Sequence, residues 1–248
     1  MYRIMCNKGL IVKFKYIECL DNLNPLKIYT LNLEKNNKKL ETIPYLTKFS
    51  NLDALFCSNN KLINLPKLPN NLQELSCHNN KLTRLPKLPD NLIYLQCNNN
   101  KLNKLPKLPN SLTDLQCNDN KLTELPTLPI NLTFLHCYNN KHLTKLPTLP
   151  STLDELMCDY TAITELPTLP INIYTLVCCN TKLTTLPINI IKCKQLPYYK
   201  KYNSYNKINK LNYLSNSKIT YYYYYNIIKY YNSKYIYNGE QIICKRKV

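Results

Sequence analysis

The feature that most constrains the fold is a cysteine that recurs at steps of 20 or 21 residues, at Cys57, Cys77, Cys97, Cys117, Cys137, Cys158 and Cys178. Each of them lies in the same frame, L-x-x-L-x-C-x-x-N-x-L-x-x-L-P-x-L-P, which is complete from Leu72 to Pro89. Self-similarity at a period of about 20 residues is typical of stacked repeats. One such repeat cannot bury its own apolar side chains, so neighbouring repeats have to share a core. The frame therefore predicts a solenoid.

The centre of each repeat has the alternation of a short strand. In Leu75-Ser76-Cys77, period 2 places Leu75 and Cys77 on one face and Ser76 on the other. Strands stacked at about 4.8 Å make a continuous parallel sheet over one core. The asparagine that follows at Asn60, Asn80, Asn100, Asn120 and Asn140 is expected to satisfy backbone groups where the strand ends. Thr161 and Thr181 replace it in the last two repeats.

The second half of each repeat is rich in proline. Six L-P-x-L-P segments lie between Leu65 and Pro170. Proline fixes φ and lacks a donor, so these arms should be extended and polyproline-like, not helical. The chain has only two glycines, both outside the repeats, so the turns depend on Asn, Asp and Pro. The prediction is a curved parallel β-sheet with an irregular convex side and few helices.

Three regions are predicted along the chain. Residues 1–50 form an N-terminal cap with a degenerate first repeat, residues 51–189 form an array of about seven repeats, and residues 190–248 form a basic cap or tail rich in Tyr, Asn and Lys. The degenerate repeat carries Leu31, Leu33, Leu40, Ile43, Pro44 and Leu46.

The repeat frame resembles the leucine-rich-repeat consensus, with Cys in a position that usually holds Leu. The tandem L-P-x-L-P segments resemble the short repeats of secreted bacterial effectors and similar arrays of large DNA viruses of amoebae, over about residues 52–187. The resemblance implies a solenoid that binds proteins, without naming a partner. One bacterial branch adds a ubiquitin-ligase domain whose catalytic Cys is followed two residues later by an acid. Here Cys193 precedes Lys194-Gln195 and Cys244 precedes Lys245-Arg246, so that activity is not inferred.

The cysteine ladder is interpreted as structural. Ligands of a zinc site would be clustered, whereas one thiol per repeat suits packing, and no metal or cofactor is predicted. Disulfides between neighbouring repeats are geometrically conceivable. Seven is an odd number, however, and neither a leader sequence nor an apolar run of transmembrane length is evident, so we expect reduced, buried thiols in an intracellular protein.

The net charge of +18 comes largely from the C-terminal region. Residues 51–189 carry 12 Lys and Arg against 10 Asp and Glu, whereas residues 190–248 carry 12 against Glu240 alone, with 14 of the 22 tyrosines. Interleaved basic and aromatic residues can bind single-stranded nucleic acid. Low complexity that reflects an AT-rich genome, or a cap over the last repeat, is the alternative interpretation.

The outward strand positions are the candidate binding surface, because they change from repeat to repeat while the frame positions barely vary. They include Ser58, Ser76, His78, Asn118 and Asp159, and the predicted partner-binding residues are Phe56, Glu74, Tyr94, Asp114, Phe134, His136, Tyr138 and Glu155. We expect their aromatic members to form a stripe on neighbouring repeats flanked by acids, as central aromatics commonly anchor interfaces. A solvated face with incidental aromatics is the alternative.

Catalysis is not predicted. The chain has three histidines, and His78 and His136 lie three repeats apart, while His142 falls at a one-residue insertion expected to form a bulged loop. No nucleophile, phosphate-loop or paired-ligand motif accompanies them. The leading hypothesis is a non-catalytic scaffold that binds a protein on its concave face. An adaptor that recruits a bound protein to ubiquitin-ligase-type machinery is second, and nucleic-acid binding through the tail is third.

Overall fold

The computed structural model describes residues 2–6, 11–14, 24–34, 39–178, 180–184, 187, 235–237 and 242–244. The predictions for the remainder of the N-terminal cap and of the C-terminal region lie outside these residues. Among the residues described, one short helix is present, the 3-10 turn η3 (Pro25–Lys27), and no helix is long and apolar enough to cross a membrane.

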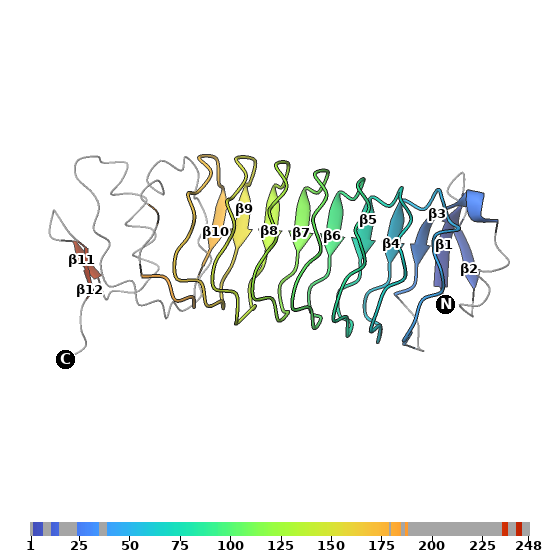
Figure 1. The fold of residues 1–248 in the computed structure, drawn as a ribbon, viewed down its shortest axis with the longest axis horizontal. Coiled ribbons are helices and arrows are strands. Elements are labelled where there is room, and N and C mark those ends of the chain that lie inside the picture. The colour runs from blue at the N-terminus through green and yellow to red at the C-terminus, as the bar shows by residue number, and fades with distance from the viewer. Residues whose placement is uncertain are drawn as a thin grey trace.

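Eight parallel strands stack in sequence order, one per coil of the chain (Figure 1). They are β3 (Ile28–Asn32), β4 (Ala54–Phe56), β5 (Glu74–Ser76), β6 (Tyr94–Gln96), β7 (Asp114–Gln116), β8 (Phe134–His136), β9 (Glu155–Met157) and β10 (Thr175–Val177). Neighbours pair in register, so that the leucine of each strand lies beside that of the next. The parallel solenoid predicted from the repeat frame is confirmed, and β3 adds a coil before Cys57.

The sheet is extended at its N-terminal end by a hairpin that the repeat frame did not predict. The strands β1 (Tyr2–Cys6) and β2 (Ile11–Phe14) pair antiparallel, and β1 pairs antiparallel with β3. This hairpin covers an edge whose backbone groups would otherwise be open to pairing. A separate two-stranded sheet is formed by β11 (Tyr235–Tyr237) and β12 (Ile242–Cys244).

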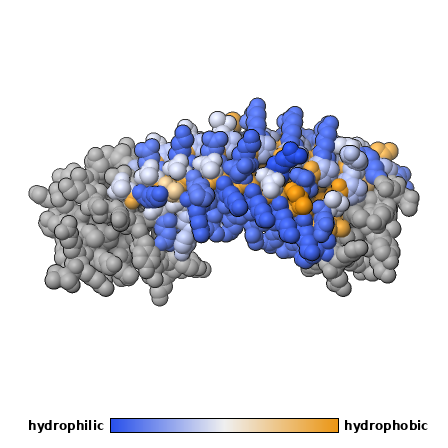
Figure 2. All heavy atoms as spheres, turned by 60° about the horizontal axis from the view of Figure 1, so that its bottom comes forward, coloured by the Kyte–Doolittle hydropathy of each residue, from blue (hydrophilic) through white to orange (hydrophobic). Residues whose placement is uncertain are grey.

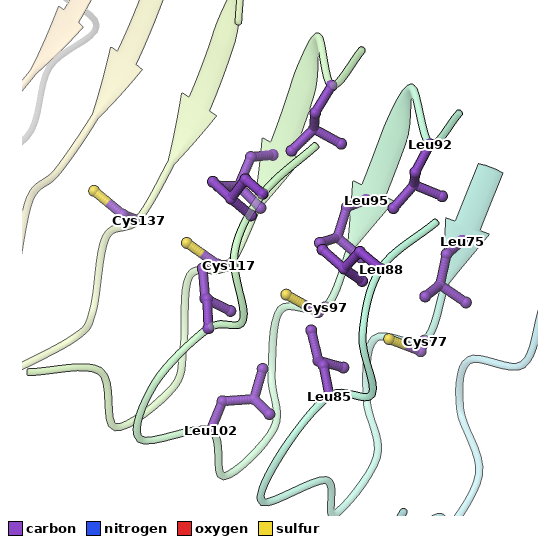
Figure 3. Packing of buried hydrophobic residues seen from close by; sticks show 14 of the residues in the cluster. Leu75, Cys77, Leu85, Leu88, Leu92, Leu95, Cys97, Leu102, Cys117 and Cys137 are labelled. Carbon is purple, nitrogen blue, oxygen red and sulfur yellow. The ribbon is translucent and has the colours of Figure 1, made fainter. Parts of the chain in front are cut away.

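The core is a set of parallel rows of leucine and cysteine side chains. Leu75, Leu95 and the equivalent strand leucines are almost completely buried, as are all seven repeat cysteines. Figure 3 shows the sulfur atoms pointing into the same interior as the leucines of the strands and arms. Burial raises the pKa of the Cys97 thiol to about 12, since the thiolate would lose its hydration. The predicted burial of these cysteines is confirmed, and Cys57, Cys77, Cys97, Cys117 and Cys137 are free thiols.

A buried or partly buried asparagine ties most coils to the one before. Asn100 donates from Nδ2 to the carbonyl oxygens of Cys97 and Cys77, both at 3.1 Å, and its Oδ1 accepts the backbone N–H of Leu82 at 3.0 Å. Asn80, Asn120 and Asn140 make the equivalent contacts. Thr161 instead donates to the carbonyl of Cys158 in its own coil, at 2.7 Å. The predicted role of this asparagine is confirmed.

The turn after each strand needs a left-handed residue. Two residues after each cysteine, φ is between 52° and 59°, at Asn59, Asn79, Asn99, Asp119, Asn139, Tyr160 and Asn180. Asn and Asp tolerate this region better than other residues that carry a Cβ, which explains how the repeats turn without glycine. Tyr160 is the exception among them. The insertion at His142 forms a local turn in which the N–H of Leu143 donates to the Asn140 carbonyl at 3.0 Å, so the predicted bulge is confirmed.

Candidate functional site: the outward face of the parallel sheet

One row of outward side chains alternates between carboxylates and aromatic rings. Strand pairing places Glu74 beside Tyr94, Tyr94 beside Asp114, Asp114 beside Phe134 and Phe134 beside Glu155. The two rings project into solvent, with 49% of the Tyr94 surface and 40% of the Phe134 surface exposed. The three carboxylate residues between and beside them are only partly exposed. We call these five residues the alternating row.

The N-terminal part of the face is occupied by a polar network. The Ser58 hydroxyl lies 2.8 Å from that of Ser76 and 2.8 Å from Nδ1 of His78. Ser76 also donates to Oε1 of Gln96 at 3.1 Å. Ser58 and Ser76 are 0% and 3% exposed, so their hydroxyls are used within the protein. The prediction that these two positions contribute to the outward surface is wrong, because His78 and its neighbours cover them.

A second network surrounds His136 in the C-terminal part. Nε2 of His136 lies 2.6 Å from Oε1 of Glu155, and its ring centroid lies 6.4 Å from that of Tyr138. Burial raises the pKa of Asp114, although a hydrogen bond from Gln116 and the nearby His136 oppose this shift. Burial also raises the pKa of Asp159, and the neighbouring Asp119 raises it further. Carboxylates thus gather around one imidazole.

Seven of the eight residues predicted for partner binding lie on strands β4 to β9, and Tyr138 lies two residues after β8, on the outward side of the sheet. The predicted aromatic stripe is not continuous. Tyr94 and Phe134 lie on β6 and β8, and Asp114 of β7 separates them. Only His136 and Tyr138 are in ring contact among the aromatic residues predicted for the site. Asn118, another position expected outward, is 3% exposed.

Sequence reasoning did not single out Asp119 as part of this surface. It occupies the left-handed turn position, accepts a hydrogen bond from Nδ2 of Asn118 at 2.6 Å and contributes to a raised pKa at Tyr138, after the larger effect of burial. The available signal was the change from Asn to Asp at a position that holds Asn in each of the three preceding repeats. A periodic turn residue is easily interpreted as structural only.

Charge is separated between the two sides of the array. No Lys or Arg occupies strands β3 to β10 or the position after each repeat cysteine. Exposed lysines instead lie at the position after the frame asparagine, at Lys61, Lys81, Lys101, Lys121 and Lys141. Figure 2, which brings forward the edge drawn lowest in Figure 1, shows hydrophilic residues in parallel rows across an arched body. The nearly neutral array is therefore acidic on the sheet face and basic elsewhere.

The chemistry of this face suits recognition. In the part of the chain that the structure describes, no group of three or more His, Cys, Asp or Glu side chains is arranged to hold a metal ion. The side chains of the alternating row offer ring faces and carboxylate oxygens, which recognise apolar and cationic groups.

No protein-family model matches the sequence, and no curated protein matches it. Solved structures do. The chain is 31% identical to the leucine-rich-repeat domain of a Shigella effector, with a TM-score of 0.53, over 70% of this chain and 76% of that one. It is 32% identical to YopM, a leucine-rich effector protein from Yersinia pestis, with a TM-score of 0.56, over 75% of this chain and 56% of that one.

A third similar structure is the functional domain of InlJ from Listeria monocytogenes, described as including a cysteine ladder. It is 31% identical, with a TM-score of 0.59, over 76% of this chain and 41% of that one. The chain thus spans about half the length of these YopM and InlJ structures. The stacked coils, the asparagine ladder and the outward sheet face define a leucine-rich-repeat solenoid. With the identity to the Shigella domain and YopM, the chain belongs to the leucine-rich-repeat proteins and has an array of the bacterial effector type.

Proposed function

We propose that this protein is a non-catalytic scaffold that binds a partner protein on the concave, outward face of its sheet. The observation that carries the proposal is the alternating row, which exposes two large rings on a face supported by a buried core of repeated leucines and cysteines. Exposed aromatics in the middle of a patch are the usual source of binding energy in protein interfaces. A partner that covers Tyr94 and Phe134 would remove both rings from water.

The similar solved structures support this class of function. They are leucine-rich-repeat effectors and a leucine-rich-repeat functional domain. Solenoids of this kind present extended concave surfaces whose exposed positions can change without disturbing the core. Recruitment to ubiquitin-ligase-type machinery and nucleic-acid binding by residues 190–248 stay as alternatives, and the described contacts favour neither of them.

The test is capture of partners from cells with wild type and with a Tyr94→Ala/Phe134→Ala variant. Both substitutions act on exposed side chains, so the fold should be retained. Loss of the captured proteins by the variant is expected, and unchanged capture would refute the concave-face proposal. The matched control is Tyr45→Ala/Ile130→Ala, which removes two side chains that are 81% and 71% exposed away from the strands. This control should capture the same proteins as wild type.

A further inference from the structure

Two carboxylates of the alternating row, Glu74 and Asp114, have no lysine or arginine partner among the residues that the structure describes. In the described part of the chain, the ion pair on this face joins Glu155 to His136, and no Lys or Arg lies within ion-pair distance of Glu74 or Asp114. Glu74 instead has Asp53 and Glu34 nearby, and its pKa is raised mainly by burial and then by these like charges. A cation brought to this row would relieve an electrostatic cost that the folded protein carries.

The exposed rings beside the carboxylates add to the same preference. Tyr94 lies between Glu74 and Asp114, and Phe134 lies between Asp114 and Glu155. A guanidinium that pairs with Asp114 would have a ring on the neighbouring strand to either side, at about 4.8 Å of strand spacing. Arginine suits such a site, because its planar guanidinium can pair with the carboxylate and stack on the neighbouring aromatic ring.

The spacing of the row limits the shape of the ligand. Successive carboxylates are two strands apart, which corresponds to about 9.6 Å along the solenoid. A polyproline II segment rises about 3.1 Å per residue with three residues per turn, so every third side chain returns to one face after about 9.3 Å. An α-helix returns to one face after about 5.4 Å, or after about 10.5 Å at two turns, and both distances match the row less closely than about 9.3 Å does. The alternating row thus fits an extended segment that runs across the strands.

We propose that the partner contributes an extended Arg- or Lys-rich segment with a basic residue at every third position. This segment lies along Glu74, Asp114 and Glu155, between the rings of Tyr94 and Phe134. The inference rests on the proposed function, in which the partner binds the concave face. Charge complementarity with an acidic face and agreement of the two repeat distances carry this assignment. The chain as a whole has a net charge of +18, so a cationic segment that binds it must do so through a local acidic surface.

The test uses the full chain and fluorescently labelled peptides, with binding followed by anisotropy at low and physiological salt. The probe is (Arg-Pro-Pro)4, and the comparison peptides are (Arg-Pro)4, which has the same charge at a different spacing, and (Glu-Pro-Pro)4. Binding of (Arg-Pro-Pro)4 in preference to both is expected, with an affinity that falls as salt rises. If the full chain binds none of them, or binds both arginine peptides equally, the proposal is overturned. An absence of binding would be expected if the chain's own basic residues 190–248 occupied the face, and that result also counts against the proposal.

Two variants with equal charge changes locate the site. Glu74→Gln/Asp114→Asn/Glu155→Gln should weaken (Arg-Pro-Pro)4 binding by at least about tenfold, because it removes three carboxylates from the row. Asp90→Asn/Glu124→Gln/Glu165→Gln removes three exposed carboxylates outside the strands, and it should change the affinity less than about twofold. Equal effects of the two variants would overturn the proposal.

The same variants separate this inference from the proposed function. One outcome is that the proteins captured by wild type are lost with Tyr94→Ala/Phe134→Ala but retained with Glu74→Gln/Asp114→Asn/Glu155→Gln. That outcome would refute the basic segment and leave the concave-face scaffold in place. Capture unaffected by either variant would refute both. Loss with both variants supports both.

Discussion

Removing the side chain of Asn100 tests how the coils are held to one another. The amide donates to the carbonyls of Cys97 and Cys77 and accepts the N–H of Leu82, so it joins its own coil to the previous one. In Asn100→Ala the two carbonyls each keep one amide donor, because Asn120 also donates to Cys97 and Asn80 also donates to Cys77. The N–H of Leu82 keeps no such substitute.

The cost of this substitution can be worked from these contacts. An unsatisfied buried N–H costs about 1–3 kcal/mol, and each lost hydrogen bond to a carbonyl that keeps another partner contributes about 0.5–1 kcal/mol. The expected loss in the free energy of unfolding is therefore about 3 kcal/mol. Asn100→Thr should lose less, about 2 kcal/mol, since Thr161 shows that a hydroxyl at this position can still bond the cysteine carbonyl of its own coil.

Chemical denaturation followed by circular dichroism measures the difference, with the midpoint and slope compared between variants. Asn103→Ala is the matched control, because Asn103 is exposed on the same coil, and it should change stability by less than about 0.5 kcal/mol. A loss below about 1 kcal/mol in Asn100→Ala, or a loss equal to that of the control, would show that the asparagine ladder does not hold the coils together.

Three further predictions concern other features of the array. Tyr160→Asn should stabilise the protein by about 1 kcal/mol, because Tyr160 has φ of 53° where most repeats have Asn, and a lower denaturation midpoint than wild type would contradict this. The seven repeat cysteines should resist iodoacetamide at pH 8 in the folded protein and react after denaturation, because all seven are buried and burial also raises the pKa of Cys77, Cys97 and Cys117. Mass spectrometry would show the labelling, and rapid labelling of these cysteines in the folded chain would refute the buried ladder. The raised pKa values of Glu74, Asp114 and Asp159 mean that the folded state holds these protons more tightly than the unfolded state, so their contribution to stability should increase as pH falls from 7 toward about 5. Urea midpoints at the two pH values measure this, and Glu74→Gln/Asp114→Asn/Asp159→Asn should flatten the pH dependence; a dependence as steep as that of wild type would exclude these groups as its source.

The fold was predictable because every repeat has the same apolar side chains, which it can bury only against a neighbouring repeat. Leu75 and Cys77 recur with the same alternation and spacing in each repeat, and a strand that buries them packs well on its copies. The N-terminal hairpin was not predictable in this way. It has no repeated partner in the sequence, and its pairing depends on the edge that β3 presents.

The surface was predictable in position but not in detail. Alternation placed Phe56, Glu74 and the other candidate residues on the outward side, yet it could not show that Ser58 and Ser76 would be covered by His78. Side-chain length and local hydrogen bonding decide that exposure. The order of carboxylates and rings along the row depends on strand register, which the recurring repeat frame fixes once the strands are known to be parallel.

The turn at His142 shows how this architecture accommodates growth. An additional residue is present there, yet β8 and β9 remain aligned, with Leu135 beside Leu156. The disturbance ends within the turn because the Leu143 N–H finds the Asn140 carbonyl nearby. Duplication of a whole 20-residue unit would disturb its neighbours even less, so a gene of this kind can lengthen by copying one segment. Each copy would add a new set of solvent-facing positions, which selection could change without altering the packing of the core.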